Sequence, residues 1–185
     1  MPMTPHFHRN HLPHFDGADY QMITYRLADA LPAEVWQRLQ DYPDKARRER
    51  IEELMDAGYG ACWLANDAVA GLVLDNWRHF DPLRYQLIAW VIMPNHVHLV
   101  IRLTTGESLA RIVHSWKSYT GKRIDALMNL PNEQHAIWQA DYWDRYIRSE
   151  QHYLAAINYI HNNPVKAGLV NTPQDWCWSS ASDHL

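Results

Sequence analysis

The chain has 185 residues, enough to form one domain with a complete hydrophobic core. Hydrophobic residues make up 47% of it, including nine Trp and ten Tyr, which excludes an intrinsically disordered chain, and no apolar run is long enough to cross a membrane. The net charge of −4 gives no general indication of nucleic-acid binding, and the two cysteines form neither a CxxC motif nor a disulfide framework, so a reducing, cytoplasmic location is expected.

The first predicted unit is an irregular N-terminal arm over residues 1–19, which is rich in histidine. Closely spaced histidines are able to bind a transition metal, but a terminus without a hydrophobic pattern favours a simple tail. Residues 20–27 follow, and their content of Tyr, Ile and Thr predicts the first strand. The histidines of the arm are His6, His8, His11 and His14.

A helical region is predicted after the first strand. It opens at residues 29–32 and continues to Gly58-Tyr59-Gly60, and its charged stretch over residues 45–53 is typical of a solvent-exposed face. The apolar residues 61–64 predict a short strand, and the spacing of apolar side chains over residues 68–80 predicts a second helix.

Two strands with a break between them are predicted over residues 85–101. The first run is apolar and aromatic, as in a strand buried on both faces, and Pro94-Asn95 interrupts it because proline cannot donate to a sheet ladder. The second run alternates, so His96 and His98 share one face of the strand. Two neighbouring imidazoles on a rigid strand suit a single metal ion, although spacing alone is more typical of surface or hydrogen-bonded histidines.

Two further helices are predicted in the second half of the chain. The first covers residues 109–127, and the second covers residues 149–161 and is expected to stop at Asn162-Asn163-Pro164, because proline ends a helix. Pro131-Asn132 predicts a loop between these helices. The tail, residues 171–185, is expected to be irregular and to pack on the domain.

Three blocks of sequence resemble the REP-associated tyrosine transposases, an IS200-like branch of the single-tyrosine HUH transposases. The first block is the His-hydrophobic-His strand, the second lies on the helix after it, and the third joins an aromatic stretch to the Asn-Asn-Pro segment. A weaker similarity lies near the start of the chain. The blocks are residues 91–100 (VIMPNHVHLV), residues 116–120 (WKSYT), and residues 138–148 (WQADYWDRYIR) with residues 159–170 (YIHNNPVKAGLV).

This resemblance covers most of residues 10–170 and implies an α+β fold. The implied core is ferredoxin-like, with an antiparallel sheet, helices mainly on one face, a helix that bears the nucleophile, and a C-terminal helical extension. The implied organisation is a single HUH transposase-like domain over residues 20–170, preceded by the arm of residues 1–19 and followed by a tail, residues 171–185, that packs on the domain.

The resemblance also implies a reaction, transesterification at phosphorus in single-stranded DNA beside hairpins of repetitive extragenic palindromes. His96 and His98 would hold a divalent cation, Mg or Mn, and Tyr119 would attack the scissile phosphate to give a 5′-phosphotyrosine. Because this intermediate keeps the bond energy, no nucleotide cofactor is expected. A phenol with a pKa of about 10 needs activation, and Lys122 and Arg123 lie near Tyr119 on the same helix surface.

The metal ligands implied in this way are incomplete. Related transposases supply a polar third ligand one turn after the tyrosine, and the residue one turn after Tyr119 is Arg123, which cannot coordinate a cation. A pair of imidazoles also suits Zn, Ni or Cu at least as well as Mg or Mn. The third ligand is left open between water, DNA and the side chains of Asp144, Glu150 and His152.

Contacts to DNA are expected from the second half of the chain. Residues 28–81 carry six Lys or Arg against eleven Asp or Glu, whereas residues 102–170 carry eight against six. Aromatic side chains such as Tyr142 and Trp143 are able to stack on unpaired bases, but they are equally typical of a core. The predicted DNA-binding side chains are Lys117, Lys122, Arg123, Arg145, Arg148 and Lys166.

Taken with the resemblance, these patterns favour a bacterial, nucleoid-associated DNA transposase, with single-stranded or hairpin DNA as its partner and no membrane partner. Two alternatives stay open: a DNA-hairpin-binding protein without strand-transfer activity, and a metal-dependent hydrolytic nuclease in which water attacks instead of Tyr119. Covalent attachment of DNA to the protein separates the three functions. Monomer and homodimer are both compatible with the sequence.

Overall fold

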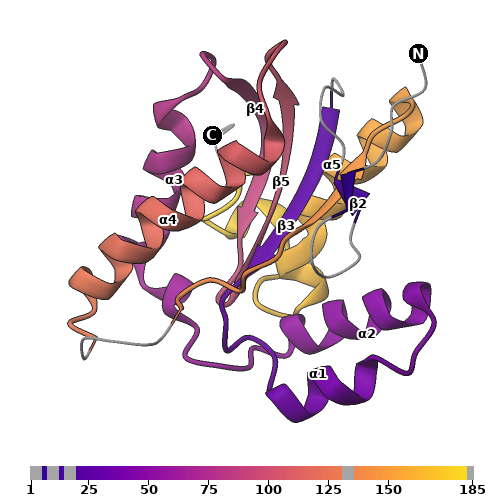
Figure 1. The fold of residues 1–185 in the computed structure, drawn as a ribbon, viewed down its shortest axis with the longest axis vertical. Helices are drawn as coiled ribbons and strands as arrows, with labels where there is room; N and C mark the ends of the chain where they lie inside the picture. Colours follow the sequence, from indigo (N-terminus) through magenta and orange to yellow (C-terminus); the bar gives the residue numbers. More distant parts are fainter. Residues whose placement is uncertain (1–5, 8–12, 15–19, 131–135, 183–185) are drawn as a thin grey trace.

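A four-stranded antiparallel sheet forms the centre of the computed structural model, which describes residues 6–7, 13–14, 20–130 and 136–182 (Figure 1). The strand order is β4-β5-β3-β6, so the first long strand is inserted between β5 and β6. A separate two-stranded ladder pairs β1 with β2 inside the predicted N-terminal arm. The strands are β1 (His6–Phe7), β2 (Pro13–His14), β3 (Tyr20–Arg26), β4 (Tyr85–Ile92), β5 (His96–Leu103) and β6 (Trp143–Tyr146).

Helices cover both faces of this sheet. The α-helices are α1 (Ala33–Leu39), α2 (Asp44–Asp56), α3 (Asp67–His79), α4 (Leu109–Leu127) and α5 (Glu150–Lys166), with 3-10 turns at Trp63–Ala65 (η1) and Pro173–Asp175 (η2). The predicted α+β class with a ferredoxin-like antiparallel sheet is confirmed. None of the helices within the described residues is long and apolar enough to span a membrane.

The alternation of β5 sends its side chains to two different layers. Val97, Leu99 and Ile101 are fully buried in the core that also holds Trp77 of α3 and Trp116 of α4. The other face of the sheet packs against α5 in a second, smaller core, where Val100 meets Ala156 and Ile160. Because side chains two apart share a face, His96 and His98 belong to the α5 side, and α4 lies on the opposite side (Figure 1).

The structure differs from the prediction in three places. The long helix after the first strand is divided into α1 and α2 at Pro43, whose ring cannot continue the hydrogen bonding of α1 but suits the start of α2. Residues 61–64 do not form a strand: Cys62 has a left-handed backbone (φ 50°) and leads into η1. The strand β6 was not predicted, because its four residues lie in a stretch whose aromatic content masks any alternation.

The last helix also departs from expectation, since α5 continues through Pro164 to Lys166. Proline inside a helix removes one backbone hydrogen bond, which usually ends the helix. Here Ile160, Asn163 and Pro164 are all buried, so packing compensates for the lost bond and holds the extra turn against the sheet. The predicted loop at Pro131-Asn132 lies outside the described residues.

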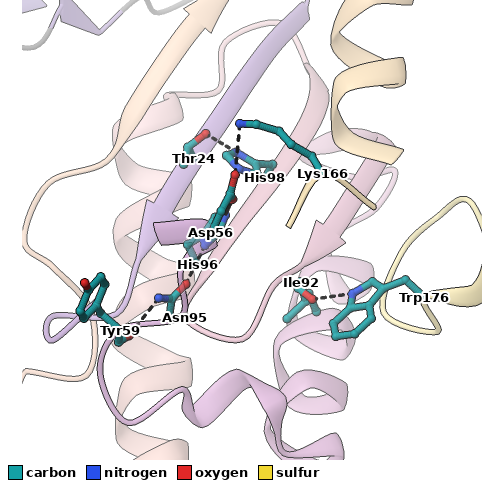
Figure 2. Close-up of polar contacts among 9 residues, drawn as sticks. All are labelled: Thr24, Asp56, Tyr59, Ile92, Asn95, His96, His98, Lys166 and Trp176. Carbon is teal, nitrogen blue, oxygen red and sulfur yellow. Dashed lines mark hydrogen bonds and ion pairs between the residues drawn. The ribbon is translucent and has the colours of Figure 1, made fainter. Parts of the chain in front are cut away.

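The tail follows the free edge of β4. The Ile92 amide donates to the Trp178 carbonyl over 2.8 Å, and the Ser180 amide donates to the Trp90 carbonyl over 2.9 Å. The Trp176 indole donates to the Ile92 carbonyl over 3.0 Å (Figure 2). These bonds satisfy backbone groups that an edge strand would otherwise leave open.

A buried hydrogen-bond network in the larger core gives a stability prediction. The Tyr85 hydroxyl donates to the Trp77 carbonyl over 2.6 Å and accepts from the Trp116 indole over 3.0 Å. Tyr85→Phe leaves both partners buried and unsatisfied, so we expect the free energy of unfolding in urea to fall by about 1–3 kcal/mol. Tyr42→Phe, at a ring that is 49% exposed, is the control and should change it by less than about 0.5 kcal/mol; equal losses would show that the network contributes nothing.

Candidate active site

The two histidines of β5 lie side by side beneath α5. Their ring centres are 4.8 Å apart, and both side chains are essentially inaccessible to solvent. One nitrogen of each ring is held from behind: His98 Nδ1 lies 2.6 Å from the Thr24 hydroxyl, and His96 Nδ1 lies 2.7 Å from Asn95 Oδ1 (Figure 2). The Nε2 atom of each ring is buried and has no hydrogen-bond partner.

The hydrogen bonds around Asn95 fix the state of the His96 ring. Asn95 donates its amide hydrogen to the Tyr59 carbonyl over 2.9 Å, which leaves its oxygen facing the imidazole. His96 Nδ1 must therefore be the donor, and Nε2 carries a free lone pair. Burial lowers the pKa of His96 to about 3, and burial with the neighbouring imidazole lowers the pKa of His98 well below its usual value, so both rings are neutral at pH 7, as metal coordination requires.

The helix α5 places two further polar side chains over this pair. The Tyr159 ring stacks edge-on against His98, with 5.3 Å between ring centres. Asn163 follows one turn later and is 1% exposed. The Tyr159 hydroxyl and both amide atoms of Asn163 are buried without a hydrogen bond of full geometry, which is rare unless a ligand or ion completes the site.

Acidic side chains reach the site from α2. Asp56 Oδ1 lies 3.9 Å from His96 Nε2, and Asp56 Oδ2 forms an ion pair with Lys166 Nζ of α5 over 3.1 Å (Figure 2). Burial raises the pKa of Asp56 and of Glu52, and Glu52 lies close enough to Tyr159 for its charge to raise the pKa of the phenol. These acids fall at the end of a helix whose charge pattern predicts only a solvated face, so the sequence offered no signal for them beyond their residue type.

The unsatisfied atoms fit a divalent cation. Among the described residues, no three His, Cys, Asp or Glu side chains are arranged to hold a metal, so a site at the histidines needs another type of ligand. The side-chain amide oxygen of Asn163 is chemically able to act as such a ligand, and it lies one turn after a tyrosine, Tyr159, which is the spacing that the transposase resemblance implies for a polar third ligand. The residues that would hold such a cation are His96, His98 and Asn163.

The structure does not bring Tyr119 to the histidines. Its helix packs on the opposite face of the sheet, because the apolar stripe that includes Ile112 and Trp116 must face the larger core. Tyr119 points outward from that helix, is 47% exposed, and accepts a long hydrogen bond of 3.4 Å from Arg123. The exposed Lys122 and Arg123 share this outer surface of α4 and lie on the far side of the sheet from the imidazoles.

Of the other predicted DNA-binding side chains, Lys117 makes a structural contact, and the remaining three lie on or near the histidine face of the sheet. Lys117 is half-buried and donates to the Ala140 carbonyl over 2.6 Å, so it pins a loop, and burial lowers its pKa to about 8. Arg145 is exposed on β6 and pairs in register with Met22, which puts it on the histidine face. Arg148 is exposed just after β6, and Lys166 lies at the site itself.

None of the three candidate third ligands lies with the imidazoles. Asp144 is buried on β6 opposite Ile23, whose side chain faces the larger core rather than the histidines. Glu150 and His152 lie in the first turn of α5, about three turns before Asn163.

Comparisons with known proteins agree with this architecture. The family model described as "Transposase IS200 like" matches residues 78–163. The REP-associated tyrosine transposase of Escherichia coli (strain K12) is 31% identical over 96 residues, which cover 52% of this chain and 54% of that protein. A Haemophilus influenzae relative is 28% identical over 110 residues, covering 52% of this chain and 58% of its own. The chain thus spans about half the length of the curated relatives it matches.

A solved structure shows the same fold over nearly the whole chain. It is the structure of a REP-associated tyrosine transposase bound to a REP hairpin, with a TM-score of 0.56 and 20% sequence identity. The match covers 97% of this chain and 84% of that one. The resemblance indicated by the sequence motifs is therefore confirmed: residues 78–163 match the model of the IS200-like transposases, and the chain is similar to the REP-associated tyrosine transposases.

Proposed function

We propose that this protein is a metal-dependent transesterase that cleaves and rejoins single-stranded DNA beside hairpins, with Tyr159 rather than Tyr119 as the nucleophile. The observation that carries the proposal is the convergence of unsatisfied buried atoms from two elements: the imidazoles of β5, and the phenol and amide of a single turn of α5. Four buried polar groups without hydrogen-bond partners would destabilise an ordinary core. A phosphoryl-transfer site uses such groups as metal ligands and as a nucleophile.

The metal in this proposal is held by His96, His98 and the amide oxygen of Asn163. When bound, it supplies Lewis-acid polarisation of the scissile phosphate. Thr24 and Asn95 hold the two rings from behind, so that neither imidazole has to reorient on binding. Mg or Mn is proposed from the family resemblance, and the hard amide oxygen of Asn163 suits either ion.

The proposed chemical step exchanges one ester bond for another. The phenolic oxygen of Tyr159 bonds to phosphorus while the bond from phosphorus to the 3′ oxygen breaks, which gives a 5′-phosphotyrosine and a free 3′-hydroxyl. Burial first, and then the charges of Glu52 and Asp56, raise the pKa of Tyr159 above its usual value, so the phenol is protonated before attack. Its proton needs an acceptor, and Glu52, whose own pKa is raised, is the neighbouring carboxylate.

The DNA in this proposal is a single strand that flanks a hairpin. The solved neighbour with the same fold is bound to a REP hairpin, and the site of this chain offers cations on the histidine face of the sheet. Attack of a DNA 3′-hydroxyl on the phosphotyrosine reverses the step, so the same residues rejoin or transfer the strand without a nucleotide cofactor.

A denaturing gel tests the proposed function. Wild-type protein incubated with labelled hairpin DNA and Mg²⁺ or Mn²⁺ should give a band that contains both the protein and the DNA on the 3′ side of the cut. The hydrolytic nuclease predicts cleavage without that band, and the DNA-hairpin-binding protein predicts a mobility shift in native gels with neither cleavage nor adduct. Either result would exclude the transesterase.

The charge distribution gives a second test, which asks which face of the sheet the DNA uses. Arg145→Ala removes a cation from the histidine face, so the slope of log Kd against log salt should decrease by about one unit or less, equally for all sequences. Arg123→Ala, on the outer surface of α4, is the matched control and should leave the slope unchanged. The reverse pattern would place the DNA on α4 and away from the histidines.

A further inference from the structure

A hollow of about 390 Å³ opens between the end of β3, the start of α1 and the segment before β6. The side chains that define it are Arg26, Asp29, Trp36 and Gln139. Arg26 lies opposite His96 in the ladder between β3 and β5, and cross-strand partners share a face of the sheet. The charge of Arg26 also contributes to lowering the pKa of His96, so the hollow adjoins the candidate active site.

The aromatic side of the hollow is a stacked pair. The guanidinium carbon of Arg26 lies 5.0 Å from the centre of the half-buried Trp36 ring. Indole rings and guanidinium planes are the surfaces on which proteins stack unpaired bases, because each base has a π-face regardless of its identity. Arg26 Nε is buried and has no hydrogen-bond partner in this structure.

The polar side of the hollow is balanced in charge. The Asp29 carboxylate accepts a hydrogen bond from the Ala61 backbone amide over 2.7 Å, which fixes its position. The backbone amide of Gln139 donates to the Arg26 carbonyl over 2.9 Å, which holds the segment that carries the Gln139 side chain. One guanidinium and one carboxylate cancel, so a phosphate gains little here. A neutral heterocycle that both donates and accepts hydrogen bonds matches the Arg26, Asp29 and Gln139 side chains.

We propose that this hollow binds one unpaired nucleobase of the DNA strand whose scissile phosphate lies at the His96–His98 pair. The proposal rests on the proposed function and adds a specificity pocket to it. Arg26, Asp29 and Trp36 precede the segment that matches the transposase family model, and Gln139 lies within it.

The test uses a hairpin oligonucleotide with single-stranded flanks, taken from the palindromic repeats beside the protein's gene. The fluorescent base 2-aminopurine is placed at each flanking position in turn. One position should be quenched on binding to wild type, since stacking on an indole quenches this base, and the quenching should be lost in Trp36→Ala. Tyr42→Ala, at an exposed ring outside the hollow, is the control and should behave as wild type.

An abasic scan of the same probe measures the affinity that the pocket contributes. Removing the quenched base should weaken wild-type binding by about 10-fold, within a range of about 5- to 100-fold. The same removal should change nothing further in Trp36→Ala, whose folding is checked by thermal unfolding; Gln139→Ala serves as a second variant should Trp36→Ala not fold.

Two results would overturn the pocket. One is an abasic scan of wild type in which no flanking position matters, and the other is a Trp36→Ala loss that is equal for intact and abasic probes. Adduct formation by the same samples separates this failure from failure of the proposed function: wild type that forms the adduct while showing either result loses only the pocket. Wild type that binds the probe without forming the adduct loses the proposed function.

Discussion

Tyr159→Phe is expected to abolish both strand cleavage and the covalent protein–DNA adduct, by about 10⁴-fold or more, with hairpin binding retained. The substitution removes only the hydroxyl and keeps the ring that packs edge-on against His98, so the fold should be unaffected. The measurement is a single-turnover cleavage assay with Mn²⁺, paired with a native-gel binding assay on the same protein.

Tyr119→Phe is the matched control for that experiment. Tyr119 is 47% exposed and lies on the far side of the sheet from the imidazoles, so its variant should cleave at the wild-type rate. If Tyr119→Phe is inactive while Tyr159→Phe is active, α4 has to move to the histidine face during the reaction, and the site described above is not the reactive one.

The second large effect is expected from Asn163→Ala. Its amide oxygen is the proposed third ligand, so the loss should weaken Mn²⁺ binding by about 10- to 100-fold in calorimetry and slow cleavage by at least about 10²-fold. High metal concentration should restore part of the rate, because the two histidines remain.

Asn162→Ala provides the control for Asn163→Ala. Asn162 is the adjacent residue of the same helix, but its amide donates to the Asn158 carbonyl over 2.9 Å on the solvent side. Metal affinity and cleavage should therefore stay at wild-type levels. Unchanged Mn²⁺ affinity in Asn163→Ala would show that Asn163 is not a metal ligand, so that only the two histidines would bind the metal.

The sequence predicted the elements whose patterns are local. The helix expected over residues 109–127 is α4 at the same bounds, because its apolar spacing is regular and Ser108 caps it. The pairing of His96 with His98 on one face follows from strand geometry alone, and β5 begins at His96 as the break at Pro94-Asn95 indicates.

The nucleophile could not be chosen from local pattern. Tyr119 and Tyr159 both lie on helices after the histidine strand, and which face of the sheet each helix covers is decided by packing between distant segments. One signal was present: the residue one turn after Tyr119 is Arg123, which cannot bind a cation, whereas the residue one turn after Tyr159 is Asn163. Proline usually ends a helix, so the sequence places Asn163 outside α5, whereas the structure continues the helix to Lys166.

Glu52 and Asp56 show the same limit in the other half of the chain. The helix α2 is highly charged, and its composition is that of a solvated surface. Its last turn nevertheless lies against α5, where Asp56 pairs with Lys166. A contact between residues so far apart in the chain leaves no periodic trace in the sequence.

The identity of the DNA-linked peptide tests the central claim most directly. Trypsin digestion of the covalent adduct, followed by nuclease trimming and mass spectrometry, locates the phosphotyrosine. We predict that the nucleotide remnant is on the peptide of residues 149–166, at Tyr159 rather than at Tyr153, the other tyrosine of that peptide. A remnant on the peptide of residues 118–122, which contains Tyr119, would contradict the assignment of the active site to the imidazole face of the sheet.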